Sequence, residues 1–273
     1  MDQNTFRPDR VGEIASKHID YHNAHRPMAA MEVDWPDGSS TGRHSHSRGQ
    51  LLYAITGVMV VESPIATWVV PPSRALWLAA DMEHDVRMFG EVRMRTVFID
   101  ATQVSGVPDQ SCVIHVSPLL RELIVAAASV PLDYLPDGRE ELLMRLLIEE
   151  LRVSDVLPLH LPLPLDPRIR LVCETLIASP SETSTVADWS RRLGIAEKTI
   201  HRLFVKQTGM TFAQWREQAR LVFALRRLGA GDRVIDIAFD CGYASQSAFT
   251  AMFRRHFGVT PSAFFEEVAD SGK

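Results

Sequence analysis

The chain is short of cysteine, and it has neither a secretory signal nor a long apolar run. Its three cysteines, Cys112, Cys173 and Cys241, are scattered among 273 residues, which excludes a disulfide framework and a four-cysteine zinc site. Residues 1–20 contain no apolar core, so we expect no signal peptide. The longest nearly apolar stretch, residues 51–61, is too short to cross a bilayer. These absences predict a cytoplasmic protein that makes no membrane contact.

Common catalytic motifs are also missing. The chain contains no G-x-S-x-G nucleophile elbow, no phosphate-binding P-loop, no G-x-G-x-x-G dinucleotide motif and no H-E-x-x-H zinc motif. Each of these motifs places a reactive or phosphate-binding group at a fixed point of a fold. We predict that the protein is not an enzyme.

Charge is unevenly distributed along the chain. The whole chain has a net charge of −5, with 29 Lys+Arg and 34 Asp+Glu. Within residues 168–255, 14 basic residues stand against only 8 acidic ones, which leaves +6 there and −11 elsewhere. A basic C-terminal third on an acidic body predicts a nucleic-acid-binding domain attached to a second domain.

The N-terminal part has the pattern of a β domain. Short β-prone runs, separated mainly by Gly and Pro, lie at residues 28–35, 51–62, 67–70, 75–79, 84–89 and 92–99. Many short strands at near-regular spacing predict a sandwich or barrel. We place this domain at residues 1–115.

Residues 116–155 change to a helical period. Leu143, Leu147 and Leu151 recur at positions i, i+4 and i+8 and form an apolar stripe, which Leu142 and Leu146 widen. The stripe fits two roles equally well: packing against the β domain, or a dimer interface between two subunits. We expect a homodimer, with this helical segment as a candidate interface.

A proline-rich segment follows at residues 156–167. It contains Pro158, Pro162, Pro164 and Pro167, and such spacing excludes a helix and favours a stiff extended chain. We predict that this segment is a linker and that residues 168–273 form a separate all-α domain.

An internal repeat is the strongest signal in the all-α domain. Residues 186–195 and 234–243 share an apolar helical period that ends at Gly194 and Gly242, an offset of 48 residues. A second apolar period follows each glycine. Because glycine readily adopts the φ > 0 backbone where a helix ends, each copy has the outline of a helix-turn-helix. A helical stretch at residues 211–228, about 27 Å long, joins the two copies.

The second helix of each copy has an apolar core face and a polar outer face. Ile200, Leu203 and Phe204 define the core face in the first copy. Polar residues on the opposite face, near the N-terminal end of the helix, are placed to read base edges in the major groove. These residues are Lys198, Thr199, His201 and Arg202 in the first copy and Ser245, Gln246, Ser247 and Thr250 in the second. Phosphate contacts are predicted for Lys206, Arg254 and Arg255.

The second copy resembles the signature of the AraC/XylS family of bacterial transcription regulators. The signature is nearly intact from Ile237 to Pro261, and the resemblance covers residues 166–265. It implies a sequence-specific regulator with double-stranded DNA, a small-molecule effector and RNA polymerase as candidate partners. It also implies that the base-reading positions are Lys198, His201, Arg202, Gln246, Ser247 and Thr250. Ala196 departs from the pattern, because a serine usually caps the first recognition helix there. That loss should cost about 0.5–2 kcal/mol of local helix stability.

The β-rich part resembles the cupin-like sensor barrel that many AraC-type regulators carry. Gly38, His44, His46, Gln50 and Gly57 keep the spacing of the first cupin motif. The second motif is degraded but keeps a histidine at position 84. Alternate residues of an extended segment share one face, so several of these side chains can project into a lumen. The predicted effector pocket comprises His44, His46, Arg48, Gln50 and His84.

A metal ion is one candidate occupant of this pocket. In metal-binding cupins, two early histidines, a glutamate and a later histidine surround a divalent ion, which points to His44, His46 and His84 as ligands for Zn²⁺ or Ni²⁺. Gln50 stands at the glutamate position, and an amide there removes the only negative ligand. The sequence therefore favours a metal-free pocket, with Arg48 available for an anionic effector.

The predicted fold class is α+β: an N-terminal cupin-like β-barrel followed by an all-α double helix-turn-helix domain. The leading functional interpretation is a transcription regulator controlled by an effector in the barrel. The alternative is a metal-dependent cupin enzyme with a helical appendage. Gln50 and the degraded second motif weigh against the enzyme, because hydrolytic or redox chemistry needs a charged, open metal site.

Overall fold

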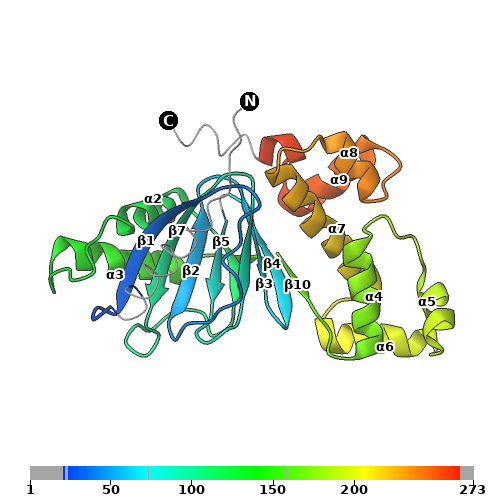
Figure 1. The fold of residues 1–273 in the computed structure, drawn as a ribbon, viewed down its shortest axis with the longest axis horizontal. Coiled ribbons are helices and arrows are strands. Elements are labelled where there is room, and N and C mark those ends of the chain that lie inside the picture. The colour runs from blue at the N-terminus through cyan, green and yellow to red at the C-terminus, as the bar shows by residue number, and fades with distance from the viewer. Residues whose placement is uncertain (1–20, 22–23, 73, 158, 265–273) are drawn as a thin grey trace.

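Two antiparallel sheets form the N-terminal domain in the computed structural model, which describes residues 21, 24–72, 74–157 and 159–264 (Figure 1). The strands are β1 (Met28–Trp35), β2 (Gly49–Ala54), β3 (Val58–Glu62), β4 (Ala66–Val70), β5 (Arg74–Leu78), β6 (Asp85–Phe89), β7 (Val92–Ile99), β8 (Cys112–His115), β9 (Val156–Leu157) and β10 (His160–Pro162). The larger sheet has the order β1-β7-β2-β5-β8-β9, and the smaller has the order β10-β4-β3-β6. The predicted β domain is confirmed.

One predicted run is two strands rather than one. Residues 51–62 divide into the end of β2 and all of β3, which lie in different sheets. Gly57, with a φ of +73°, lies in the turn between them, and glycine accepts this left-handed backbone at little cost. The structure also contains β8, a short strand that the sequence pattern did not predict.

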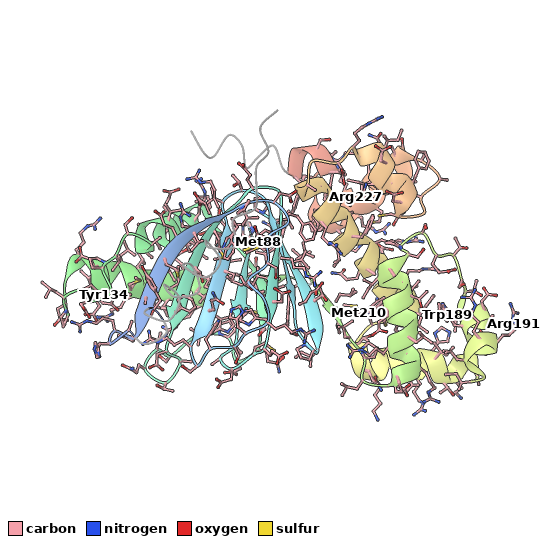
Figure 2. All side chains as sticks on the ribbon, in the orientation of Figure 1. Met88, Tyr134, Trp189, Arg191, Met210 and Arg227 are labelled. Atoms are coloured by element: carbon pink, nitrogen blue, oxygen red, sulfur yellow. The ribbon has the colours of Figure 1, made fainter. Side chains whose placement is uncertain are left out.

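Buried side chains fill the space between the sheets. They include Leu52 of the larger sheet and Met59, Trp68 and Met88 of the smaller one. Figure 2 shows Met88 within this interior. Alternation along each strand directs every second side chain inward, which explains why short, mixed runs can form a continuous core.

Helices α2 (Pro118–Ala127) and α3 (Arg139–Arg152) cover the outer face of the larger sheet. Leu147 and Leu151 are 0% and 2% exposed and pack in one cluster with residues of β2. Packing on the β domain is therefore the role of these two leucines. Leu142 and Leu146 face solvent instead, at 60% and 44% exposed.

Within the predicted proline-rich linker, residues 156–157 and 160–162 are short strands that belong to the β domain, and Pro167 already begins the next helix. β9 pairs with β8, and β10 pairs with β4, with Leu161 opposite Thr67. β10 is an edge strand, where a proline such as Pro162 is tolerated because the free edge needs no N–H donor. Residues 163–166 alone connect the sheets to the next helix.

The remaining helices form the C-terminal domain: α4 (Pro167–Ala178), α5 (Val186–Leu193), α6 (Glu197–Thr208), α7 (Phe212–Gly229), α8 (Val234–Asp240) and α9 (Gln246–Phe257). The predicted repeat is confirmed, since α5–α6 and α8–α9 are the two helix pairs and α7 joins them (Figure 1). No helix in the described ranges combines the length and apolar character needed to cross a membrane.

Helix α7 also covers the outer face of the smaller sheet, where it contacts β3, β4, β6 and β10. The approach is close: a Cβ added to Gly229 would lie 2.3 Å from a methyl carbon of Val58. Near the other end of α7, the Trp215 indole N–H donates to the carbonyl of Pro162 at 2.8 Å. The C-terminal domain is thus packed directly against the β domain.

Candidate nucleic-acid interface and histidine cluster

The first helix-turn-helix comprises α5 and α6. Thr185 and Asp188 cap the start of α5 reciprocally, and Gly194 ends it with a φ of +64°. Ala196 occupies the N-cap position of α6 and makes no side-chain hydrogen bond there, as the sequence predicted. The Ser190 hydroxyl donates to the carbonyl of Ile195 at 2.7 Å, so this serine ties α5 to the turn.

The two faces of α6 are divided as the sequence predicted. Ile200 and Phe204 are fully buried. Four of the residues predicted to contact DNA are exposed and lie along the other face, namely Lys198, His201, Arg202 and Lys206. Exposed donors near the N-terminal end of a second helix have the placement that base reading requires.

The second helix-turn-helix comprises α8 and α9. The Ser245 hydroxyl accepts from the backbone N–H of Ala248 and caps α9, so the two recognition helices differ at their starts. Phe249 and Phe253 are fully buried. Gln246 and Ser247 are exposed, and Thr250 is half-buried.

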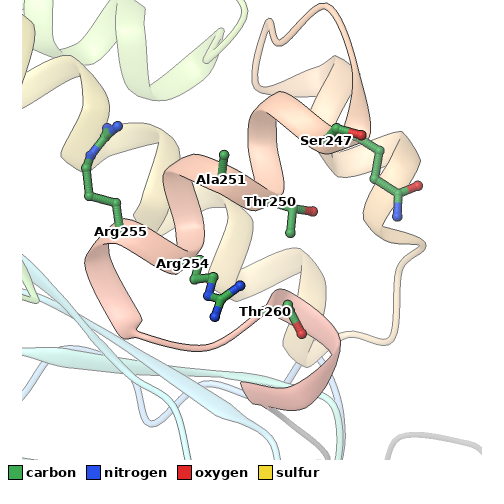
Figure 3. Close-up of a pocket in the computed structure, with 7 residues that line it drawn as sticks. Ser247, Thr250, Ala251, Arg254, Arg255 and Thr260 are labelled. Atoms are coloured by element: carbon green, nitrogen blue, oxygen red, sulfur yellow. The ribbon is translucent and has the colours of Figure 1, made fainter.

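A groove runs along the exposed face of α9 (Figure 3). Its lining contains both base-reading and phosphate-binding candidates: Gln246, Ser247, Thr250, Ala251, Arg254, Arg255 and Thr260. The groove mixes polar and apolar lining atoms, and Arg254 within it can meet a phosphate of an anionic duplex. Sequence reasoning missed Glu217 of α7, which forms an ion pair with Arg255, because residues 38 positions apart show no shared pattern.

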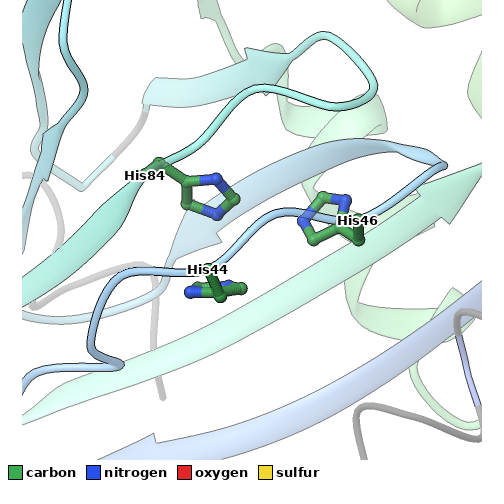
Figure 4. Close-up of side chains that lie close together, drawn as sticks. All are labelled: His44, His46 and His84. Atoms are coloured by element: carbon green, nitrogen blue, oxygen red, sulfur yellow. The ribbon is translucent and has the colours of Figure 1, made fainter.

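Three histidines meet at one end of the β domain (Figure 4). His44 and His46 lie on the segment before β2, and His84 immediately precedes β6. A backbone bridge between His44 and His84 joins the two segments. One ring nitrogen from each histidine can be chosen so that all three lie within 4.8 Å of one another. The predicted convergence is therefore present in the structure.

Each imidazole is held in place by a main-chain carbonyl two residues away. The Nδ1 atoms of His44, His46 and His84 lie 2.7–2.8 Å from the carbonyl oxygens of residues 42, 48 and 82. A carbonyl can only accept, so each neutral ring carries its proton on Nδ1 and its lone pair on Nε2. Metal-binding histidines are usually oriented by such hydrogen bonds.

The Nε2 atoms have an unusual environment. His84 is 1% exposed, and its Nε2 has no hydrogen-bond partner among the described residues. His46 Nε2 lies 2.8 Å from Oε1 of Gln50, whose amide nitrogen donates to Thr96. These two side chains are hydrogen-bonded, with the tautomer of His46 and the orientation of the Gln50 amide deciding which of them donates.

Burial favours the neutral form of His46 and His84. Desolvation lowers the pKa of His46, and it lowers the pKa of His84 to about 4, with the neighbouring histidines adding to the shift. A neutral imidazole is the form that coordinates a metal ion. The cluster is therefore prepared for a ligand at neutral pH.

Arg48 does not join the histidines. Its guanidinium donates to the main-chain carbonyls of Ala24 and Arg26, and it interacts electrostatically with Asp100 and Tyr134. The predicted pocket therefore contains the three histidines and Gln50, while Arg48 secures the start of the chain's described part.

The residues present fit a divalent transition metal. Tetrahedral zinc with nitrogen ligands places them roughly 3.4 Å apart, and the cluster spans at most 4.8 Å. The closure that this requires, at most about 1.4 Å, is within the range of side-chain rotation. His44, His46 and His84 would hold the ion, and the Gln50 carbonyl is the fourth donor at hand.

Comparisons with known proteins agree with both halves of this description. Residues 34–157 match the AraC-like ligand binding domain, and residues 189–267 match a helix-turn-helix domain. The chain therefore joins a ligand-binding β domain to paired helix-turn-helix units, and this combination identifies the class of DNA-binding transcription regulators that carry a ligand-binding domain.

Three known proteins are similar to the chain over different shares of its length. The chain is 34% identical to the HTH-type transcriptional regulator NimR of Escherichia coli (strain K12), over 97% of this chain and 92% of NimR. The HTH-type transcriptional regulator RipA of Corynebacterium glutamicum is 33% identical over 38% of this chain and 31% of RipA. The structure of ToxT from Vibrio cholerae O395 is similar over 89% of this chain and 98% of ToxT, with a TM-score of 0.38 and 11% identity. The chain belongs to the AraC/XylS family of transcription regulators.

Proposed function

We propose that this regulator binds DNA under the control of a divalent transition metal ion held by His44, His46 and His84. The observation that carries the proposal is the convergence of three oriented imidazoles, one of which, His84, has a buried Nε2 without a partner among the described residues. Zinc and nickel suit imidazole ligands better than magnesium does. The protein acts in the cytoplasm as a regulator and not as an enzyme.

The packing of α7 against the smaller sheet supports control of the DNA-binding domain by this site. His84 immediately precedes β6, and the ring of Phe89 at the other end of β6 lies 4.7 Å from the guanidinium of Arg226 on α7. The two backbones also approach closely just after β6, because a Cβ added to Gly90 would lie 2.6 Å from the carbonyl oxygen of Gly229 on α7. A shift of β6 on ligand binding would therefore press directly on the helix that joins the two DNA-binding units.

Metal content tests the ligand. The purified chain should retain about one zinc or nickel ion, measured by elemental analysis, and His46→Ala and His84→Ala should each release it. His115→Ala is the matched control, because His115 is exposed and lies outside the cluster. A metal content no higher than background in the parent chain would overturn the metal proposal, and a small organic effector would then be the remaining candidate. So would an ion that survives both substitutions.

Metal dependence of DNA retention tests the coupling. Adding a chelator should change the affinity of the parent chain for a promoter duplex, and Gly229→Val should abolish that response by forcing α7 from Val58. Ala230→Val is the control, because Ala230 is exposed at the same helix end. A response that persists in Gly229→Val would contradict this route.

On the DNA side, we propose that one subunit reads two successive major-groove segments of a non-palindromic site. The support is the pair of covalently linked recognition helices with different exposed residues, Lys198, His201 and Arg202 on α6 and Gln246, Ser247 and Thr250 on α9. A footprint confined to one groove segment would contradict this proposal. RNA polymerase beside the site is a further expected partner.

The exposed face of α3 supports a homodimer. Leu142 and Leu146 are one helical turn apart and point away from the β domain, and a second copy would cover them isologously. Leu146→Asp should yield monomers in sedimentation, whereas Leu119→Asp on α2 tests whether the interface extends to the neighbouring helix. An unchanged dimer in Leu146→Asp would place the interface elsewhere.

A further inference from the structure

The last turn of α9 contains three consecutive basic residues: Arg254, Arg255 and His256. The sequence assigns Arg254 and Arg255 the same role as phosphate contacts, but the structure separates them. Both side chains line the groove, but Arg254 extends toward Thr260, whereas Arg255 turns its guanidinium toward Glu217 of α7 (Figure 3). Arg254 has no ion-pair partner within the described chain, so its charge is available to an incoming ligand.

Glu217 on α7 binds the other two residues. Arg255 Nη2 and His256 Nε2 each lie 2.6 Å from the same oxygen, Oε1 of Glu217. Partial burial by itself would raise the pKa of Glu217, but the hydrogen bonds from His256 and Arg255 lower it overall. The carboxylate is therefore charged at neutral pH, and its charge offsets that of Arg255.

We propose that Glu217 is a positioning residue for the second recognition helix, with Arg255 as its anchor and Arg254 as the phosphate contact. Adjacent helix positions differ by about 100° around the axis. Two adjacent residues of α9 held by one oxygen of α7 therefore fix the rotation of α9. We call the contacts of Glu217 with Arg255 and His256 the Glu217 clamp. A rotation of α9 would move Gln246 relative to the base edges, so the clamp affects base specificity.

Apolar packing alone does not supply this restraint. The rings of Phe253, Phe257 and Phe264 lie 4.5–5.5 Å apart and attach α9 to the core. Dispersion contacts between rings tolerate small rotations, whereas charge-assisted hydrogen bonds are directional. The Glu217 clamp therefore adds orientation to a helix whose attachment comes from phenylalanine packing.

The two arginines should differ in the salt dependence of DNA binding. Each phosphate that a protein neutralises contributes about 0.9 to the slope of log affinity against log salt concentration. Arg254→Ala should lower that slope by about 1, on any DNA sequence. Arg255→Ala should change the slope little, because Glu217 already offsets that charge.

The experiment uses the full chain with two probes: a duplex pool of random sequence, from which bound molecules are sequenced, and one scrambled duplex for salt titration. Glu217→Ala and Arg255→Ala should each weaken base preference about tenfold in one segment of the selected site and leave the Arg202 segment unchanged. The double variant should be no worse than either single variant, since the pair acts as a unit. Glu217→Gln, which keeps an acceptor oxygen, should recover part of the preference.

Two results would overturn the clamp: equal loss of salt slope in Arg254→Ala and Arg255→Ala, or an unchanged base preference in Glu217→Ala. Thermal midpoints of all variants, measured in the same buffer, separate these effects from unfolding. The inference rests on the proposal that α9 reads bases. If that proposal fails, Gln246→Ala leaves every base preference unchanged, while the salt slopes still distinguish Arg254 from Arg255.

Discussion

The two halves of the molecule hold their functional polar groups in opposite environments. His46, Gln50 and His84 are buried in the β domain, whereas Arg202 and Gln246 are exposed on the recognition helices. A buried polar group must be satisfied by the fold or by a ligand, while water satisfies an exposed one. Changes in the buried cluster should therefore alter stability, and changes on the reading faces should alter binding alone.

The sharpest test of this contrast lies within α9, which has one buried and one exposed face. Phe253→Ala should lower the free energy of unfolding by about 3–5 kcal/mol, because it removes a fully buried ring from the core. Gln246→Ala should change it by less than about 0.5 kcal/mol. Chemical denaturation of both variants checks the difference. A large loss of stability in Gln246→Ala would break the comparison.

The buried histidines should make the metal-free protein sensitive to acid. His84 has a pKa of about 4 in the folded chain and about 6.5 when unfolded, so the unfolded state takes up the proton first as the pH falls. Stability should therefore be lost between pH 6.5 and pH 4, by about 3 kcal/mol from this residue. Above pH 6.5 the ring is neutral in both states, so this residue no longer makes the free energy of unfolding depend on pH.

Denaturation curves of chelated protein at several pH values measure this effect. His84→Gln should flatten the pH dependence in that window, whatever its stability at pH 7. His115→Ala, at an exposed position, should keep most of the parent's slope. An equal slope in the parent and in His84→Gln would show that the buried ring is not responsible.

The exposed residues should affect binding without affecting folding. Arg202→Ala should weaken binding and relax base preference in one segment by about 1–3 kcal/mol, and Gln246→Ala should do the same in the other. Titration of a selected duplex against single-base variants of that duplex measures each loss. Loss of preference in both segments from one substitution would mean that the two units do not read DNA independently.

The smallest expected effects concern the helix starts. Ala196 leaves α6 without a side-chain cap, whereas Ser245 caps α9. Ala196→Ser should therefore stabilise the chain, and Ser245→Ala should destabilise it, each by about 0.5–2 kcal/mol. Urea unfolding of both variants checks the signs. Two substitutions with effects of the same sign would show that local capping does not control these helices.

The double helix-turn-helix could be predicted almost completely from the sequence. Helical periodicity and left-handed glycines act within a few residues, so Gly194 at the end of α5 and Ala196 at the start of α6 could be placed correctly. The histidine cluster could be predicted in part, because His44 and His46 are neighbours in the chain. The place of Arg48 could not be predicted, because its partners, the carbonyls of Ala24 and Arg26, lie before the first strand.

The sequence by itself determined the fold class, the two helix-turn-helix units and the identities of the histidines, because these depend on short-range patterns of apolar residues and turns. Only the tertiary structure decided which leucines of α3 are buried and that Glu217 binds Arg255. It also decided that β9 is added to the larger sheet and β10 to the smaller one. Each of these depends on which distant surface a residue meets. A helical or extended period shows which residues share a face but not what will cover it, since that partner is chosen by packing among segments far apart in the chain.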